Sequence, residues 1–355
     1  MAIGFTSAIA DFDQKHFDSL DRTAGYPSSY TRLRQKEQDP RWISRYLEWA
    51  DGGLLKAAIP VYRSRMNSWP DKAYDPRSWV LPDGAGDECS PGSSLLVGGC
   101  GDRRTGLHLD AEAKAPGTLR SLLVELARLA ADENRCLAFP YMHAAARNAL
   151  SAATDNRIVW AELAREAHIV GLSDAEWESK LPRKIRKKLR QDRCRIAAAP
   201  VAVGRLGDGT ASWDEVRPWA AELISHQHAV KGDPEPSEFV NFRYSDLQEN
   251  PDLDVFVFTA QSPGLRGVTT AVVWEGEMEL CEVGLRGENS EERIAVYLST
   301  CFHQPFQYAQ ARGIDHIRCG STAEATKAAR GAVFTEYYGG VLAASETKRL
   351  AHEGS

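Results

Sequence analysis

Residues 254–285 read DVFVFTAQSPGLRGVTTAVVWEGEMELCEVGL, and this stretch decides the fold. It holds three apolar runs, at 254–260, 267–274 and 278–285, with a glycine in each intervening turn. Short apolar runs that are separated by tight turns are typical of β-strands in hairpin order. The stretch therefore predicts an antiparallel meander of three strands.

Helix and strand patterns alternate on both sides of the meander. The patterns predict helices over 212–232, 290–313 and 321–331, and strands over 201–206, 314–320 and 332–344. Pro305 is expected to kink or divide the long helix, which Gly313 ends. Ser321 and Glu324 are expected to cap the short helix. This order predicts one mixed α/β domain.

The first half of the chain shows a similar order after a polar, mostly helical start over residues 1–50. Strands are expected at 53–62, 94–99 and 136–140, helices at 117–131 and 143–150, and further sheet segments at 158–163 and 167–172. A chain of 355 residues fits two domains of about 150–200 residues each. The predicted fold class is α/β, with mixed central sheets that are flanked by helices.

A basic segment over 173–196 joins the two halves. Between residues 183 and 195 it carries eight basic residues and one acid, Asp192. An apolar stripe at helical spacing runs along the segment, and Pro182 breaks the helix or opens a second one. We therefore predict an N-terminal domain over 1–172, a basic linking helix over 173–196 and a C-terminal domain over 197–355.

Composition excludes several classes of protein. The net charge of −6 argues against a bulk nucleic-acid-coating protein. Seven dispersed cysteines without a C-x-x-C pair argue against a disulfide framework and a zinc site. No apolar run approaches the ~18–20 residues of a membrane span, and the N-terminus does not resemble a signal peptide. We expect a cytoplasmic protein with no membrane partner, no metal and no tightly bound cofactor.

Common catalytic and phosphate-binding motifs are also absent from the sequence. It contains no G-x-S-x-G, H-E-x-x-H or G-x-x-x-x-G-K-[ST] pattern. Residues 98–106, GGCGDRRTG, are a further candidate for phosphate binding, although no helix is predicted directly after them. The pattern leaves the oligomeric state open.

Two segments resemble the Fem-type, acetyltransferase-6-like group of the GNAT superfamily. The junction matches an aromatic, a leucine and a basic run, here Trp177, Leu181, Arg183, Ile185 and Arg186. Residues 313–331 match the group's C-terminal signature E-x-x-K-x-x-(R/K)-G, here Glu324, Lys327, Arg330 and Gly331. The resemblance is clear over 170–355 and holds only in outline before that.

The resemblance implies tandem GNAT-like domains and transfer of an acyl or aminoacyl group to an amine, with formation of an amide bond. In this group the donor is an aminoacyl-tRNA or an acyl-CoA. The acceptor is a cell-wall precursor or a small metabolite, as in antibiotic biosynthesis. A non-catalytic binding protein on a degenerate fold is a third hypothesis.

The expected CoA pyrophosphate loop, LRGENSEE at 285–292, departs from the GNAT pattern. Only Arg286 and Gly287 fit, and three carboxylates crowd a place that should attract phosphate. We therefore favour aminoacyl-tRNA as the donor and keep acyl-CoA or an acyl carrier protein as the alternative.

The resemblance also suggests the residues that act. Lys327 is expected to stabilise the oxyanion of the tetrahedral intermediate, and Arg330 to bind a phosphate. Glu282, in the strand at the expected cleft, is a candidate for removing a proton from the attacking ammonium.

The remaining candidates bind the two substrates. Five cations of the junction are expected to follow the donor's phosphates, namely Arg183, Lys184, Arg186, Lys187 and Arg190. The alternative is a solvated amphipathic helix. His226, His228 and Tyr297 are candidates for binding the acceptor. The two histidines do not share a helix face, which argues against a metal site.

Overall fold

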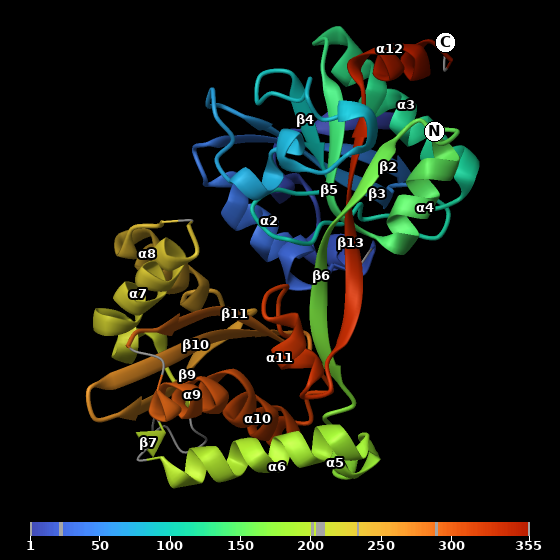
Figure 1. Cartoon of the computed structure of the whole chain (residues 1–355). Coiled ribbons are helices and arrows are strands. Elements are labelled where there is room, and N and C mark those ends of the chain that lie inside the picture. The colour runs from blue at the N-terminus through green and yellow to red at the C-terminus, as the bar shows by residue number, and fades with distance from the viewer. Residues whose placement is uncertain are drawn as a thin grey trace. The chain divides into compact units, whose positions relative to one another are not determined.

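The computed structural model describes residues 2–20, 24–199, 202–203, 210–232, 234–287 and 290–353 (Figure 1). Packing divides the chain into two compact units: unit 1 comprises residues 1–165 and 336–355, and unit 2 comprises residues 166–335. The chain passes from one unit to the other within strands β6 (Val159–Val170) and β13 (Val333–Leu342). The predicted ranges differ from these units, because residues 173–196 pack within unit 2 and the last twenty residues pack within unit 1.

Unit 1 is a mixed sheet with helices. The strand order is β1-β2-β3-β4-β5-β13, and among these described strands β4 and β5 are the one parallel pair. The strands are β1 (Ala2–Thr6), β2 (Trp42–Asp51), β3 (Leu54–Ser64), β4 (Ser94–Val97) and β5 (Cys136–His143). The helices are α1 (Gln14–Leu20), α2 (Tyr30–Glu37), α3 (Pro116–Asp132), α4 (Ala144–Ala153) and α12 (Ala344–Glu353). Short 3-10 turns lie at Ile9–Asp11, Tyr26–Ser28, Lys72–Tyr74, Pro76–Ser78 and Pro82–Gly84.

Unit 2 contains the predicted meander. Its strands follow the order β6-β12-β11-β10-β9-β7, and β8 also pairs with β9. They are β7 (Ala202–Val203), β8 (Thr210–Ala211), β9 (Asp254–Ser262), β10 (Leu265–Trp274), β11 (Glu277–Leu285) and β12 (His316–Arg318). The helices are α5 (Trp177–Lys180), α6 (Arg183–Ala198), α7 (Trp213–Val230), α8 (Ser237–Gln248), α9 (Glu291–Leu298), α10 (Gln304–Arg312) and α11 (Glu324–Ala328). A π-helical segment, Ser299–His303, joins α9 to α10.

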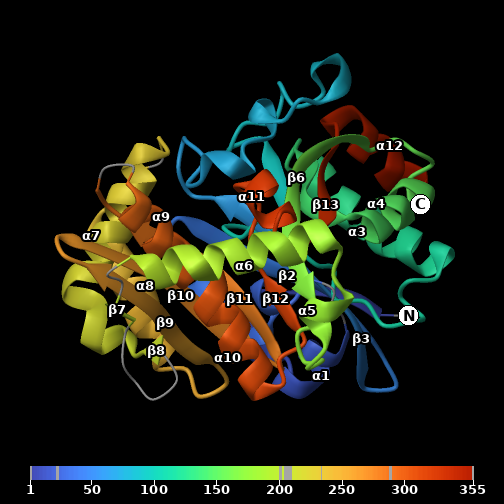
Figure 2. The ribbon, with the colours of Figure 1, turned by 60° about the horizontal axis from the view of Figure 1, so that its bottom comes forward.

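Helices cover both faces of the unit 2 sheet. Helices α7 and α8 pack on one face, and α9, the π-helical segment and α10 pack on the other (Figure 1). Helix α6 lies outside α9 and α10, on the side away from the sheet (Figure 2). Leu189 of α6 is buried, and Ile185 and Ile196 pack against the same core. The predicted apolar stripe of the junction therefore faces the protein, and its basic surface faces outward.

The fold class is confirmed, and the local predictions succeed unevenly. Helix α6 begins directly after Pro182, and Gly313 ends α10 in the left-handed conformation. A π-helical turn, Ser299–His303, interrupts the regular α-helix just before Pro305, and the backbone stays helical through it. Residues 1–50 are less helical than predicted, because β1 and β2 lie there. The predicted strand over 201–206 falls on a segment of which only Ala202–Val203 is described.

The predicted cap of the short helix is wrong. Helix α11 begins only at Glu324, and Ala323 is its N-cap with a left-handed backbone and no side-chain hydrogen bond. Within the described ranges, no helix combines the length and apolar character that crossing a bilayer requires.

Candidate active site

Strands β11 and β12 form a fork in unit 2. They pair in parallel over three residues, from Glu277 opposite His316 to Glu279 opposite Arg318. Beyond that point β12 ends, and Gly320 (φ 72°) turns the chain away from the sheet. In the described chain no strand pairs with Leu280–Leu285 of β11 on that side. The fork therefore leaves backbone hydrogen-bonding groups available to a ligand.

A β-bulge in β11 lies at the fork. The register changes from Thr269 opposite Val283 to Ala271 opposite Leu280, which places Cys281 and Glu282 opposite the single residue Thr270. Bulges redirect side chains and are common beside active sites. The Thr270 hydroxyl accepts a hydrogen bond from the Glu282 N–H (3.0 Å) and contacts the Tyr244 hydroxyl (2.7 Å). These contacts hold the backbone of Glu282 in place.

Helix α7 brings His228 to Glu282. A side chain at Gly284 would collide with the backbone of Ile224, so the glycine lets α7 pack closely on β11. His228 lies one helical turn after Ile224, on the same face. Its Nε2 is 3.1 Å from Glu282 Oε1, and its Nδ1 is 3.2 Å from Glu235 Oε2.

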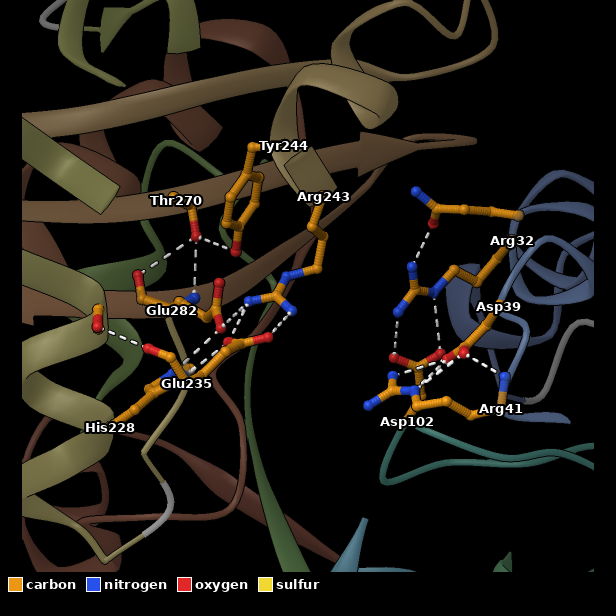
Figure 3. A network of polar contacts seen from close by, with 12 residues as sticks. Arg32, Asp39, Arg41, Asp102, His228, Glu235, Arg243, Tyr244, Thr270 and Glu282 are labelled. Carbon is orange, nitrogen blue, oxygen red and sulfur yellow. Dashed lines mark hydrogen bonds and ion pairs between the residues drawn. The ribbon is translucent and has the colours of Figure 1, made fainter. Parts of the chain in front are cut away.

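Helix α8 supplies Arg243, which completes the cluster (Figure 3). Its guanidinium donates two hydrogen bonds to Glu235, both of 2.8 Å, and one of 2.9 Å to Glu282 Oε1. We call His228, Glu235, Arg243 and Glu282 the acid–base cluster. Each of its side chains exposes between 16% and 27% of its surface, so a substrate can reach the cluster.

Mutual contacts keep all four groups charged. Hydrogen bonds to Glu235 and Glu282 raise the pKa of His228 to about 9. Burial favours protonation of Glu235, but Arg243 and His228 outweigh it and lower the pKa of that carboxyl to about 2. Burial opposes the charge of Glu282 as well, yet Arg243 and His228 still lower its pKa. At neutral pH the cluster has two positive and two negative charges, and His228 carries both ring protons.

His228 should make the stability of the protein depend on pH. Its folded pKa of about 9 exceeds its ordinary 6.5, so its contribution is complete below pH 6.5 and is lost as pH rises through about 9. The shift corresponds to about 3 kcal/mol. We expect the Tm to fall by about 5–10 °C between pH 6.5 and 9.5 from this group, measured by calorimetry.

The matched control for this prediction is the other histidine of α7. His228→Gln should flatten the fall in Tm above pH 6.5, whereas His226→Gln should retain it, because His226 is exposed and His228 is the histidine that pairs with the two acids. Equal pH dependence in both variants would contradict the role of His228. On the acid side, Glu235 should stabilise the protein above pH 4.5, and this contribution should be lost as pH falls through about 2.

The cluster also has the donor atoms of a metal site. Ligand atoms of His228, Glu235 and Glu282 lie within 4.8 Å of one another. Arg243 already supplies a cation that donates to both carboxylates. The geometry therefore explains how the two acids are neutralised without a metal ion.

Lys327, the predicted oxyanion stabiliser, lies at the fork. Its Nζ donates a 2.9 Å hydrogen bond to the carbonyl of Gly320, the residue that turns the chain away after β12. The side chain is 7% exposed, and burial lowers its pKa. Among the described residues its amine forms no ion pair shorter than 4.0 Å. Burying a cation without an acidic partner lowers the stability of the fold. Lysines that are retained in such places are typically functional rather than structural.

Arg330, one turn later, has a different environment. Its Nη2 is 2.7 Å from Asp192 Oδ2, Nη1 donates to the Thr326 carbonyl, and the guanidinium stacks on Phe302. Only 3% of the residue is exposed. Arg330 therefore links the end of α11 to α6. Nothing in this environment supports the phosphate contact that was predicted for it.

The predicted donor-binding cations lie on α6. Arg183, Lys184, Lys187 and Arg190 are exposed, and no acid within the described ranges lies within ion-pair distance of any of them. Arg186 is half-buried and donates to the Ser179 carbonyl. Residues 183, 187 and 190 share one helix face. The fold therefore presents an exposed basic stripe on α6.

The other two acceptor candidates do not join the acid–base cluster. His226 is exposed on α7 and points away from His228 by helical spacing. Tyr297 packs against Phe302, with ring centroids 5.9 Å apart, and burial raises its pKa. Their roles in acceptor binding stay predictions. Glu235 and Arg243, which the sequence analysis did not single out, take the places next to Glu282.

The start of α9 is acidic. Ser290 caps this helix by accepting from the Arg293 N–H, and Glu291 and Glu292 occupy its first turn. Arg195 of α6 lies 3.6 Å from Glu291. Residues 288–289 of the expected pyrophosphate loop lie outside the described residues. The described part of the loop thus places two carboxylates at the N-terminus of α9. A diphosphate would bind there through the positive end of the helix dipole.

The glycine-rich stretch 98–106 in unit 1 is held by ion pairs. Asp102 receives hydrogen bonds from Arg32 of α2, both of 3.0 Å (Figure 3). It also pairs with Lys36. The next helix, α3, begins only at Pro116. The stretch is an anchored loop that lies well before a helix start, which does not fit a phosphate loop.

Comparison with known proteins identifies the fold. No protein-family profile and no curated protein sequence match the chain. Among solved structures, the chain is similar to FemX, with a TM-score of 0.59 and 10% identity over 93% of this chain and 96% of that chain. It is also similar to the C-terminal domain of a putative lysylphosphatidylglycerol synthetase from Agrobacterium fabrum, with a TM-score of 0.54 and 12% identity over 97% and 96%.

A third similar structure is a tandem GNAT protein from the clavulanic acid biosynthesis pathway. It gives a TM-score of 0.54 and 13% identity over 97% of this chain and 99% of that chain. These similarities extend over nearly the whole chain, although the identities are low. The chain therefore has the tandem GNAT-like fold of Fem-type proteins.

Proposed function

We propose that this protein transfers an aminoacyl group from an aminoacyl-tRNA to an amine and so forms an amide bond. The observation that carries the proposal is the fork between β11 and β12, which places a free strand edge, Glu282 and the buried Lys327 amine in one unit. The fold supports acyl transfer by analogy, because the similar structures include a tandem GNAT protein and a protein named for a lysyl-carrying lipid.

The charges on α9 and α6 favour aminoacyl-tRNA over acyl-CoA as the donor. The carboxylates in the first turn of α9 would repel the diphosphate of CoA. The exposed cations of α6 instead suit the phosphate backbone of an RNA. An acyl-CoA donor remains the second candidate, because the clavulanic acid pathway protein that shares the fold is described in a form without AcCoA.

The proposed chemistry exchanges an ester for an amide. The acceptor nitrogen attacks the ester carbonyl, the carbon–oxygen bond to the ribose breaks, and the ribose hydroxyl leaves with a proton. Lys327 stabilises the negative charge that develops on the carbonyl oxygen. His228 and Arg243 hold the ionised Glu282 carboxylate in place, and this carboxylate is suited to binding the acceptor's ammonium and to accepting the proton that the ammonium must lose before attack. A second proton passes from the nitrogen to the ribose oxygen as the carbon–oxygen bond breaks.

The direct test is transfer from tRNA charged with radiolabelled amino acids to a panel of primary amines. The expected product is an amide that carries the label and that disappears when the tRNA is digested with RNase before the assay. Product formation from acetyl-CoA that is insensitive to RNase would replace the proposed donor with the second candidate. Absence of product from both donors would contradict acyl transfer.

Glu282→Gln tests the acceptor side of the proposal. The substitution keeps the size of the side chain and removes the charge that would hold the ammonium, so we expect kcat/KM for the amine to fall about 10- to 100-fold. Glu279→Gln, on the same strand but outside the acid–base cluster, is the control and should stay near the wild-type value. A similar small effect of both variants would contradict the role of Glu282.

A further inference from the structure

A pocket lies between α6 and the α9–α10 side of unit 2. Its volume is about 160 Å³. Its apolar wall contains Trp177, Phe302 and Phe306. Cavities of about 150 Å³ accept one benzene ring. This pocket therefore suits a single planar group of a larger ligand rather than a whole cofactor.

One side of the pocket is a polar stripe. His303, Gln307 and Gln310 line it, and their spacing of four and three residues places them on one face of the helix. Within the described ranges, no side-chain hydrogen bond of these three residues occurs. Burial lowers the pKa of His303, so at neutral pH its ring offers one donor and one acceptor. The stripe can thus both donate to and accept from the edge of a planar ligand.

The π-helical segment Ser299–His303 is held in place by Gln304. The Gln304 amide donates to the Thr259 carbonyl and to Ser299 Oγ, both at 3.0 Å, which ties this turn to the sheet. Phe302 and His303, just before it, both reach the pocket. π-Helical turns occur frequently at functional sites. The sequence around Pro305 is therefore arranged to present an aromatic ring and an imidazole on the side away from the sheet.

We propose that this pocket binds the adenine base of a nucleotide donor. Aromatic rings stack on bases, and side-chain amides pair with the exposed edge of adenine. Helix α6 forms the opposite wall through Leu189, Asp192 and Arg193, where Asp192 pairs with Arg330 and Arg193 pairs with Glu178. The exposed cations of the α6 stripe lie outside this wall and offer the donor's phosphates a counter-charge. This inference rests on the proposed function in one respect: both candidate donors, charged tRNA and CoA, contain adenosine.

The test measures binding alone, with no acceptor and no turnover. An uncharged RNA minihelix that ends in CCA is compared with one that ends in CCU, by fluorescence anisotropy. The wild-type protein should bind the CCA form at least 5-fold more tightly. Gln307→Ala combined with Gln310→Ala should remove this preference, and both positions are exposed, so the variant should fold. Gln191→Ala, an exposed glutamine of α6 outside the pocket, should retain the preference.

A parallel titration with CoA and AMP distinguishes the sources of the base. Loss of CoA and AMP binding in the double variant, with RNA binding unaffected by the terminal base, would assign the pocket to CoA. An equal preference for CCA in the wild-type and double-variant proteins, or no binding of RNA, CoA or AMP at all, would overturn the proposal. The protein could fail to transfer aminoacyl groups and still prefer the CCA minihelix in the way described. This result would support the adenine pocket and contradict the proposed transfer reaction.

Discussion

Lys327→Met is expected to reduce the rate of acyl transfer by a factor of about 10² to 10³ while leaving the Tm within about 2 °C of the wild-type value. The loss of rate follows from removing the cation that, in the proposed mechanism, stabilises the developing oxyanion. The unchanged stability follows from the burial of Lys327, whose amine forms a single hydrogen bond within the described part of the chain, to Gly320. Methionine has a similar length and no charge to desolvate, which offsets the lost hydrogen bond.

Arg330→Met is the matched comparison, because it lies one turn away and is just as buried. Its removal leaves Asp192 buried, with Lys188 at 3.2 Å as the one ion-pair partner among the described residues. Breaking a buried pair costs about 3–5 kcal/mol. We expect the Tm to fall by about 10 °C, with transfer per folded molecule close to the wild-type rate.

The two variants thus test whether Lys327 acts in catalysis and Arg330 in stability. Calorimetry and single-turnover transfer assays measure both quantities on the same samples. If Lys327→Met lowers the Tm as strongly as Arg330→Met and leaves transfer unchanged, the amine is structural, and the proposed mechanism loses its oxyanion stabiliser. The comparison is informative because both cations belong to the same signature, E-x-x-K-x-x-R. In the structure, however, Arg330 pairs with an acid, whereas Lys327 donates to a backbone carbonyl.

In the second half of the chain, secondary structure could be predicted from the sequence wherever neighbouring residues determine it. The meander is marked by apolar runs between glycine turns. Gly313 ends α10 because glycine adopts the left-handed conformation without steric cost, and Pro182 precedes α6 because proline has a fixed φ and no N–H to continue a helix. Ser321 failed as a cap because Ala323 adopts the left-handed conformation and starts α11 two residues later. A capping pattern is a local preference that the surrounding chain overrides.

The acid–base cluster could be predicted only in part. Glu282 and His228 are candidates from the sequence, and their side chains meet at 3.1 Å. Helix α8, which carries Arg243, was not predicted. Its buried residues Val240, Tyr244 and Leu247 do follow helical spacing, but the exposed Phe239 and Phe242 hide the stripe. The bulge at Thr270 depends on strand register, which the sequence does not display.

The basic stripe of α6 leads to the second large expected effect. Replacing Arg183, Lys187 and Arg190 together by alanine should weaken tRNA binding about 100-fold near 0.1 M salt. The slope of log affinity against log salt concentration should become less steep by about 2, because each phosphate contact contributes roughly 0.7–0.9. These side chains are exposed, so the fold should tolerate their removal.

The control removes three exposed cations from unit 1, namely Lys72, Lys114 and Lys348. Both triple variants change the net charge of the protein by the same amount. A general attraction between RNA and the protein would therefore weaken equally in both. Filter binding across a salt series tests this directly: an equal slope in the two variants would mean that α6 is only a solvated face. A lower slope confined to the α6 variant would place the RNA backbone along the helix that also forms one wall of the adenine pocket.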